Sequence, residues 1–101
     1  MRQSFTPVAQ PTFARVAPRW WVTNFGGIVV QGIVAKRSKS RFMKVGFALA
    51  VTTHVVEAGY AYRTAKQRGL EDDAVRWGLQ TLGVGFPSLF ALQATLRALD
   101  A

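Results

Sequence analysis

The chain contains no cysteine and a single histidine, His54. Without cysteine it forms neither a disulfide framework nor a Cys-ligated zinc site or iron–sulfur cluster. A di-metal carboxylate site would need a second histidine beside several acids. We therefore expect no bound metal and no cofactor.

Motifs of the common catalytic sites are also missing. The chain has no G-x-S-x-G sequence, and no second histidine is available for a catalytic triad. The glycines at 83 and 85 lead into Phe86 and Pro87, whereas a phosphate-binding loop would continue into Lys and then Ser or Thr. These absences predict that the protein is not an enzyme.

Acidic residues are absent from the first 56 positions, although basic residues occur there from Arg2 onward. Such an N-terminus resembles a mitochondrial or plastid targeting segment, and a juxtamembrane basic arm without a targeting role is the alternative. The whole chain carries a net charge of +8, yet half of its residues are hydrophobic. This combination suits a membrane protein with basic flanks better than a nucleic-acid-binding protein, so we expect no nucleic-acid partner.

Residues 1–19 hold three of the four prolines, Pro7, Pro11 and Pro18. Prolines at this density interrupt any continuous helix. We therefore predict an extended basic N-terminal arm that becomes ordered only by lying on a partner or on lipid head groups.

A short hydrophobic segment follows at residues 20–35. It opens with two tryptophans, which favour the head-group level of a membrane. Its apolar part is shorter than the roughly 20 residues that one span needs. The segment is therefore either a tilted or protein-buried third span or an interfacial or re-entrant segment.

Five cations come next, and the simplest interpretation is that they flank the following helix. Contact with an anionic phospholipid such as cardiolipin is the alternative function of this block. The five residues are Lys36, Arg37, Lys39, Arg41 and Lys44.

The stretch Val45–Tyr62 has no Lys, Arg or Asp and predicts a transmembrane helix over residues 42–68. Gly69 fits the position that ends a helix, and the acids after it suit the first turn of the next. That next helix is predicted over residues 71–99, with a kink at Pro87. The predicted fold is all-α integral membrane, an antiparallel transmembrane helical hairpin with a short candidate third span and an extended arm.

At 100° per residue, His54 and Glu57 share one face of the first helix with several small residues. Small residues mark close helix packing in membranes, and intramembrane polar groups face protein rather than lipid. We predict that His54 and Glu57 make an intramembrane polar contact with protein. The predicted helix-packing residues are Gly46, Ala50, Thr53, Ala61, Gly78 and Gly85.

Several segments of the predicted hairpin together resemble a known family. These are His54–Ala61, Lys66, Gly69, Arg76–Thr81 and Gly85–Leu89. They make residues 46–92 similar to the small membrane proteins related to vertebrate transmembrane protein 254. The resemblance implies a multi-span α-helical protein and implies no activity. The arm and residues 20–35 lie outside the resembling part.

Small size, a basic N-terminus and an arm in need of a partner surface favour a structural role. We expect a non-catalytic supernumerary (accessory) subunit of a mitochondrial inner-membrane energy-transducing complex, either ATP synthase or a respiratory-chain complex, acting in assembly and stability. Its partners would be other membrane subunits and an anionic phospholipid such as cardiolipin. The alternatives are a free-standing small protein of the endomembrane system and a proton-path component that uses Glu57.

Overall fold

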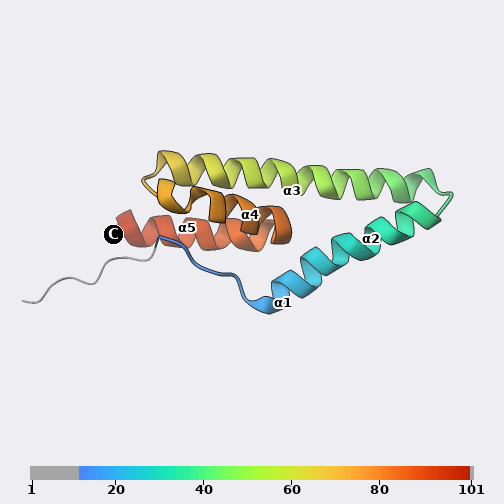
Figure 1. The fold of residues 1–101 in the computed structure, drawn as a ribbon, viewed down its shortest axis with the longest axis horizontal. Coiled ribbons are helices and arrows are strands. Elements are labelled where there is room, and N and C mark those ends of the chain that lie inside the picture. The colour runs from blue at the N-terminus through green and yellow to red at the C-terminus, as the bar shows by residue number, and fades with distance from the viewer. Residues whose placement is uncertain (1–11, 101) are drawn as a thin grey trace, which may run out of the picture.

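The computed structural model describes residues 12–100, and every regular element in this range is helical. In chain order, the first elements are α1 (Pro18–Trp20), a π-helical turn (Trp21–Phe25), α2 (Gly26–Arg37) and α3 (Arg41–Gln67). A 3-10 turn (Glu71–Asp73), α4 (Ala74–Val84) and α5 (Phe86–Asp100) follow (Figure 1). The molecule is long and narrow, with principal extents of 69 × 25 × 18 Å.

The hydrophobic segment expected at residues 20–35 lies within an uninterrupted helical run from Pro18 to Arg37. Pro18 starts this run, because a proline at the first helical position loses no hydrogen bond and already has a helical φ. Within the π-helical turn, the Thr23 hydroxyl donates to the carbonyl oxygen of Arg19 at 2.9 Å. Back-bonding of this kind often accompanies a bend in a helix.

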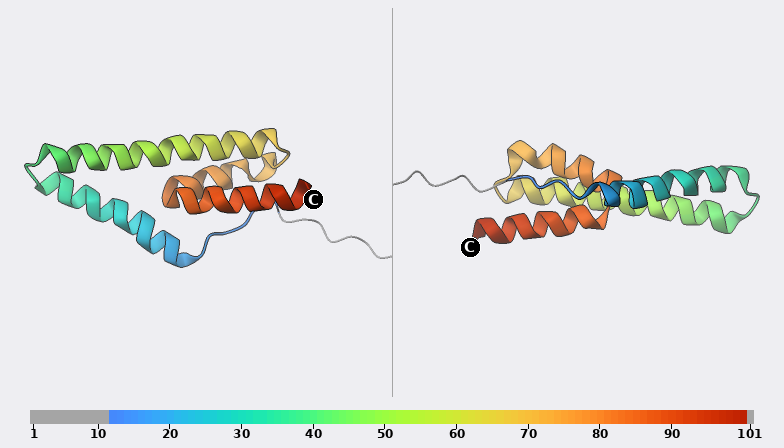
Figure 2. Two further views of the ribbon diagram at one scale, coloured as in Figure 1. Left: turned by 180° about the vertical axis from the view of Figure 1, so that it is seen from behind. Right: turned by 90° about the horizontal axis from the view of Figure 1, so that it is seen from below.

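α2 and α3 meet at a short turn, residues 38–40, and diverge from it like the arms of a V (Figures 1 and 2). The Ser40 backbone N–H donates to the Ser38 hydroxyl oxygen at 3.0 Å. The Lys44 ammonium donates to the carbonyl oxygen of Ala35 at 2.9 Å, across the turn. That carbonyl belongs to the last turn of α2, where helical carbonyls have no partner of their own. Side chains of Ser38 in the turn and of Lys44 in α3 therefore stabilise the connection between the two helices.

The end of α3 agrees with the sequence prediction. Gly69 has a φ of 87°, and the Leu70 N–H donates to the carbonyl oxygen of Ala65 at 2.8 Å. This bond ends a helix when a residue with positive φ follows the last turn. Leu70 then packs into the core, and three acids from Glu71 to Asp73 lie at the start of the next helical stretch.

The single helix predicted over residues 71–99 is wrong, because the chain reverses direction at Gly85. Gly85 has a φ of 75° and a ψ of −135°, a conformation that glycine adopts far more readily than other residues. α5 runs back antiparallel to α4 (Figure 1), and an ion pair of 2.6 Å joins Arg68, just after α3, to Asp100 at the end of α5. Pro87, expected to kink one helix, instead lies in the first turn of α5, where its missing N–H is harmless.

The predicted integral membrane hairpin is wrong for the same reason. No helix in the described range 12–100 is both long enough and apolar enough to cross a membrane. The reversal leaves α4 and α5 with 11 and 15 residues, whereas a span needs about 20. α3 has 27 residues, but it carries His54 and Glu57 near its middle and basic residues near both ends.

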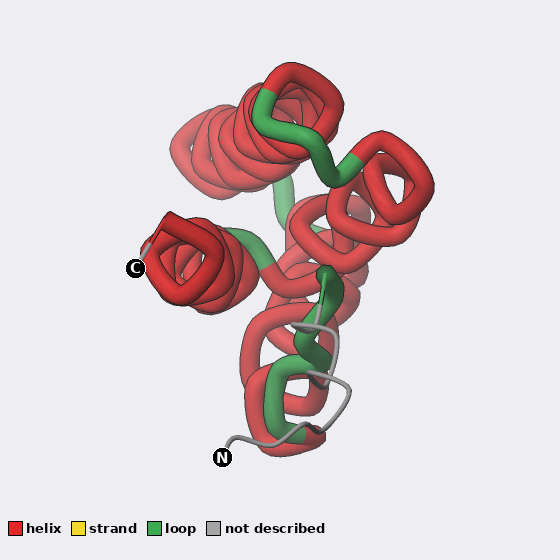
Figure 3. The backbone as a smooth tube through the Cα atoms, turned by 90° about the vertical axis from the view of Figure 1, so that its left-hand side faces the viewer, coloured by secondary structure: helices red, strands yellow, loops and turns green. Residues whose placement is uncertain are grey.

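The hydrophobic core lies in the half of the molecule where α3, α4 and α5 run side by side. Figure 3 looks along the long axis onto this half. The buried cluster consists of Ala61, Ala65, Leu70, Ala74, Trp77, Leu92 and Leu96. In α2, by contrast, Ala35 is the one buried residue. The molecule thus has a compact half, built from α3, α4 and α5, and a projecting half, built from α2 and the first part of α3.

We predict that alanine has opposite effects on stability at Gly69, just after α3, and at Gly59, within α3. At Gly69 a β-carbon would meet no neighbouring atom, so the positive φ alone makes Gly69→Ala destabilising by about 1 kcal/mol. Gly59 lies inside α3 with equally open surroundings, and Gly59→Ala should stabilise by about 0.5–1 kcal/mol through helix propensity. Equilibrium unfolding in mild detergent, followed by circular dichroism, measures both changes. Stabilisation of both variants would contradict the helix end at Gly69.

Candidate functional site

Residues 12–17, which we call the strap, lie along α4 of the same chain. The Trp77 indole N–H donates to the carbonyl oxygen of Thr12 at 2.8 Å. The Gln80 amide holds the strap twice: Nε2 donates to the carbonyl oxygen of Ala14, and Oε1 accepts the N–H of Val16, each at 3.0 Å. The expectation that the arm needs a partner or head groups to become ordered is therefore wrong for the strap. Residues 1–11 of the predicted arm lie outside the described residues.

A buried polar network continues from the strap into α5. Gln80 Nε2 also donates to the Ser88 hydroxyl at 3.1 Å, and the hydroxyls of Ser88 and Thr81 are hydrogen-bonded at 2.8 Å. Ser88 and Thr81 are fully buried, and Gln80 is 5% exposed. Every buried side-chain nitrogen or oxygen in the described range has a hydrogen-bond partner. One amide thus joins the strap, α4 and α5.

None of the predicted site residues is Trp77, Gln80, Thr81 or Ser88, although all four lie in the segments that carry the family resemblance. Their common feature is a hydrogen-bonding group within an otherwise apolar run. Buried polar groups almost always have partners, so Gln80, Thr81 and Ser88 in neighbouring segments indicate a shared network. What the sequence does not show is that the chain reverses between Thr81 and Ser88.

The first helical run is fastened to the reversal by three contacts. The Trp21 ring lies so close to Gly83 that a β-carbon there would be 2.3 Å from Cζ3 of the ring. The Asn24 amide donates to the carbonyl oxygen of Val84 at 2.7 Å, and the rings of Trp20 and Phe86 pack edge to face at 5.9 Å. Both tryptophans, expected at a membrane interface, therefore contact the turn between α4 and α5.

His54 and Glu57 contact the same reversal from the inner face of α3. His54 Nδ1 lies 2.8 Å from the carbonyl oxygen of Leu82, and Nδ1 must carry the proton because a carbonyl only accepts. This carbonyl is in the last turn of α4 and has no partner within its helix. A β-carbon at Gly85 would lie 3.1 Å from His54 Nε2 and 3.3 Å from Glu57 Oε1. The structure thus brings His54, Glu57 and Gly85 together, and the polar pair faces protein of its own chain.

The other predicted packing residues divide into two groups. Ala61 is buried in the core, and Gly78 lets α3 approach so closely that a β-carbon would be 3.3 Å from Cβ of Tyr62. Gly46 and Thr53 are exposed and lie at one edge of the predicted face, so neither packs against another described helix. The packing face is therefore narrower than predicted.

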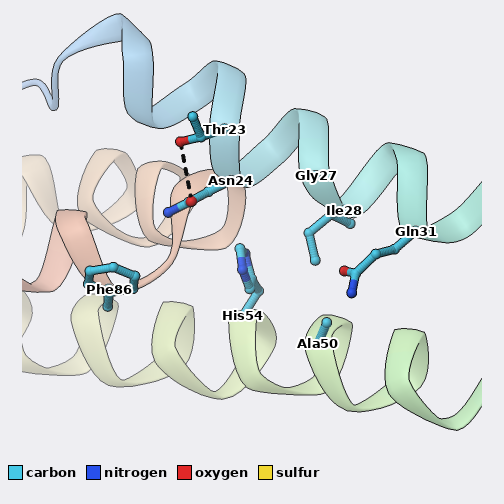
Figure 4. Close-up of a pocket in the computed structure, with 8 residues that line it drawn as sticks. All are labelled: Thr23, Asn24, Gly27, Ile28, Gln31, Ala50, His54 and Phe86. Atoms are coloured by element: carbon cyan, nitrogen blue, oxygen red, sulfur yellow. Dashed lines mark hydrogen bonds between the residues drawn. The ribbon is translucent and has the colours of Figure 1, made fainter. Parts of the chain in front are cut away.

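Ala50, the remaining residue of that face, is half-buried beside His54 in a cavity of about 340 Å³ between α2 and α3. In Figure 4, His54 points from α3 toward the first helical run, where Asn24 of the π-helical turn and Ile28 and Gln31 of α2 line the cavity with it. The cavity is open, and no Asp, Glu, Lys or Arg is among the residues that line it. The Thr23 hydroxyl donates to the carbonyl oxygen of Arg19 and His54 to that of Leu82, so the cavity shows no hydrogen-bonded pair of a nucleophile and a base.

The predicted lipid-contacting cations surround the turn at residues 38–40, at the opposite end of the molecule from the core. We call residues 36–44 the basic tip. The Lys44 ammonium donates a hydrogen bond to the carbonyl oxygen of Ala35. The other four cations and Phe42 are exposed, with Phe42 at 83%. Positive charge beside an exposed aromatic ring is chemistry that an anionic lipid surface attracts.

One side of α3, turned away from α2 and α4, is apolar and uncovered within the described chain. This outer face consists of Phe42, Val45, Leu49, Val56 and Tyr60, each between 49% and 83% exposed. Thr52 lies on the same side and donates its hydroxyl to the carbonyl oxygen of Ala48 at 2.7 Å. The hydroxyl hydrogen of Thr52 is therefore bonded within α3 and needs no water molecule as its partner. The charged residues of this stretch, Lys44 and Glu57, point toward the other elements.

A family model described as Transmembrane protein 254 matches residues 5–94 of the chain. The match includes the strap and residues 20–35, so the limit of 46–92 inferred from the sequence was too narrow. Both segments pack on residues that carry the resemblance, the strap on Gln80 and Trp20 on Phe86. No curated protein and no solved structure matches the chain. The family name is that of a membrane protein, in agreement with the expected membrane location at that coarse level.

We predict that Gln80→Leu releases the strap. Leucine occupies a similar volume but leaves the Val16 N–H and the Ala14 carbonyl without their partner, at a cost of about 2–4 kcal/mol in total. The bonds after Arg15 and Arg19 should then become accessible, and limited trypsin cleavage at these two sites should accelerate at least tenfold.

Gln31→Leu is the matched control for this experiment. Gln31 is exposed on α2 and makes no hydrogen bond with any other residue between 12 and 100. Its replacement should change neither the cleavage rate nor the unfolding midpoint. If native protein and Gln80→Leu are cleaved at the same rate, the amide does not hold the strap.

Proposed function

The chain belongs to the transmembrane protein 254 family, and on that premise we propose that it is a non-catalytic accessory subunit of a membrane complex, acting in assembly and stability. The more specific proposal is an energy-transducing complex of the mitochondrial inner membrane, either ATP synthase or a respiratory-chain complex. Family membership supports the membrane location. The basic, acid-free first 56 residues support the mitochondrial part.

The outer face of α3 is the observation that carries the proposal. Contiguous exposed apolar surface marks a site of interaction with protein or membrane, whereas single exposed apolar residues carry no such meaning. Five large side chains are aligned here on one helix. Gly59 and Thr52 lie between them, and small residues of this kind let a neighbouring helix approach closely. We infer that an apolar helix of another subunit covers this face.

The polar side chains support a structural rather than a catalytic role. Gln80 and Ser88 are occupied in holding the strap and the reversal, and His54 caps a free carbonyl of α4. A catalytic group must instead be free to meet a substrate atom. In this proposal the interior hydrogen bonds keep the compact half rigid while the projecting half meets its partners.

The basic tip supports lipid as a second partner. Four exposed cations and Phe42 lie at the far end of a molecule 69 Å long, away from the core. Each Lys or Arg near an anionic surface contributes about 1 kcal/mol. In the proposed complex, an anionic phospholipid such as cardiolipin binds here, while the outer face of α3 contacts protein.

The test compares two valines of nearly equal exposure. Val56 on the outer face is 65% exposed, and Val75 on α4 is 60% exposed. Val56→Lys would place an unpaired ammonium in an apolar interface, so the amount of protein in the complex should fall at least tenfold. Val75→Lys should leave it unchanged, because Val75 lies outside the proposed interface. Blue-native electrophoresis of mitochondria solubilised in mild detergent measures the fraction of chain in a large complex.

Several results would contradict the proposal. Native protein that migrates only as a monomer is not a subunit of a stable complex. Recovery of the chain in endomembrane fractions, with none in mitochondria, would overturn the mitochondrial part. Equal losses in the two lysine variants would show that the outer face is not the docking surface. The circular dichroism spectra of both variants should match that of native protein, which excludes loss by unfolding.

A further inference from the structure

A groove of about 640 Å³ lies between the strap, the π-helical turn and α4. Its apolar walls come from Phe13 of the strap, from Trp21 and Val22, and from Leu79 of α4. Two basic side chains, Arg15 and Arg76, also line it. Sites for small ligands are typically concave, mostly apolar and supplied with a few polar groups, and this volume falls within their usual range.

The remaining polar side chain at the groove, Gln80, is fully occupied. Its Oε1 accepts the N–H of Val16, and its Nε2 donates both to the Ala14 carbonyl and to the Ser88 hydroxyl. The amide therefore has no hydrogen left for a ligand. The polar recognition that the groove offers thus comes from the two guanidinium groups.

Both arginines keep donors for an anion. Arg15 is exposed and makes no hydrogen bond or ion pair with any other residue in the range 12–100. Arg76 donates through Nη1 to Asp73 at 3.0 Å and lies over the Phe13 ring at 5.1 Å from the ring centre. Its side chain is 62% exposed, and one carboxylate contact leaves most of its five N–H donors open. No acidic side chain lines the groove itself.

We propose that this groove binds an anionic phospholipid, with an acyl chain along Phe13, Trp21 and Leu79 and the phosphate between Arg15 and Arg76. Guanidinium groups recognise phosphate oxygens through paired, charge-assisted hydrogen bonds. The apolar walls require a hydrocarbon body, which excludes inorganic phosphate as the complete ligand. Val22 and Leu79 are 73% and 61% exposed, so the apolar surface continues out of the groove and can meet a second chain.

This site is separate from the basic tip and does not depend on which complex the chain joins. The tip lies around residues 38–40, whereas the groove lies beside the strap in the compact half. The proposal therefore stands or fails apart from the subunit role. In this proposal the strap contributes to lipid binding, because it forms one wall of the groove.

Fluorescence of Trp21 tests the proposal. The native chain in mild detergent is titrated with phosphatidylglycerol carrying brominated acyl chains, which quench a nearby indole. Saturable quenching is expected, and Trp21→Phe should reduce it, because Trp21 lines the groove whereas Trp77 is buried and Trp20 packs on Phe86. Phosphatidylcholine with the same chains has no net charge and should bind at least tenfold more weakly.

Arg15→Gln should lower the affinity for phosphatidylglycerol about tenfold, equivalent to roughly 1.4 kcal/mol for one charge-assisted contact. Arg97→Gln is the control, since Arg97 is exposed on α5 outside the groove and its loss changes the net charge equally. Three results would overturn the proposal: equal quenching by both lipids, unchanged quenching in Trp21→Phe, or displacement of the lipid by inorganic phosphate at the lipid's own concentration.

Discussion

At Gly85 the chain turns back on itself, and contacts from four separate segments converge on that turn. The reversal places Ser88 beside Gln80 and Thr81, so that one amide reaches both the strap and α5. It frees the Leu82 carbonyl for His54 and leaves Gly83 open to the Trp21 ring. The Ser88 bonds and the unpaired Leu82 carbonyl require the antiparallel α4 and α5, so a straight helix through this region would lose both. The reversal itself depends on the positive φ of Gly85.

The two halves of the molecule differ in how much of their surface they bury. In the compact half, Gln80, Thr81 and Ser88 form a buried hydrogen-bonded network, and Trp77 and Leu92 are fully buried. In the projecting half, apolar side chains of α2 and α3 point outward, with Ile33 and Leu49 more than half exposed. A two-helix element with so little buried surface gains stability from whatever covers it. The compact half then serves as the anchor from which this surface is presented.

The sequence predicted the α3 end correctly because independent local patterns agreed there: basic residues, Gly69 and then a run of acids. At Gly85 the local sequence patterns did not agree on one structure. A glycine followed by Pro87 inside an apolar run is compatible with a kink or with a reversal, and only His54 and Ser88, distant in sequence, decide between them. His54 and Glu57 were found because two polar groups inside an apolar helix are conspicuous. Gln80 was missed because its partners belong to backbone of the strap, 64 and 66 residues away.

α4 also lies between the two proposed binding surfaces, the groove and the outer face of α3. Gly78 lies against Tyr62 of α3, whereas Gln80 holds the strap, and two residues along a helix differ by about 200° in direction. The strap and its groove thus lie on one side of α4, with α3 on the other. The outer face of α3 is turned away from α4 altogether. A partner helix on that face and a lipid in the groove would therefore not compete for space, and one subunit can hold both at once.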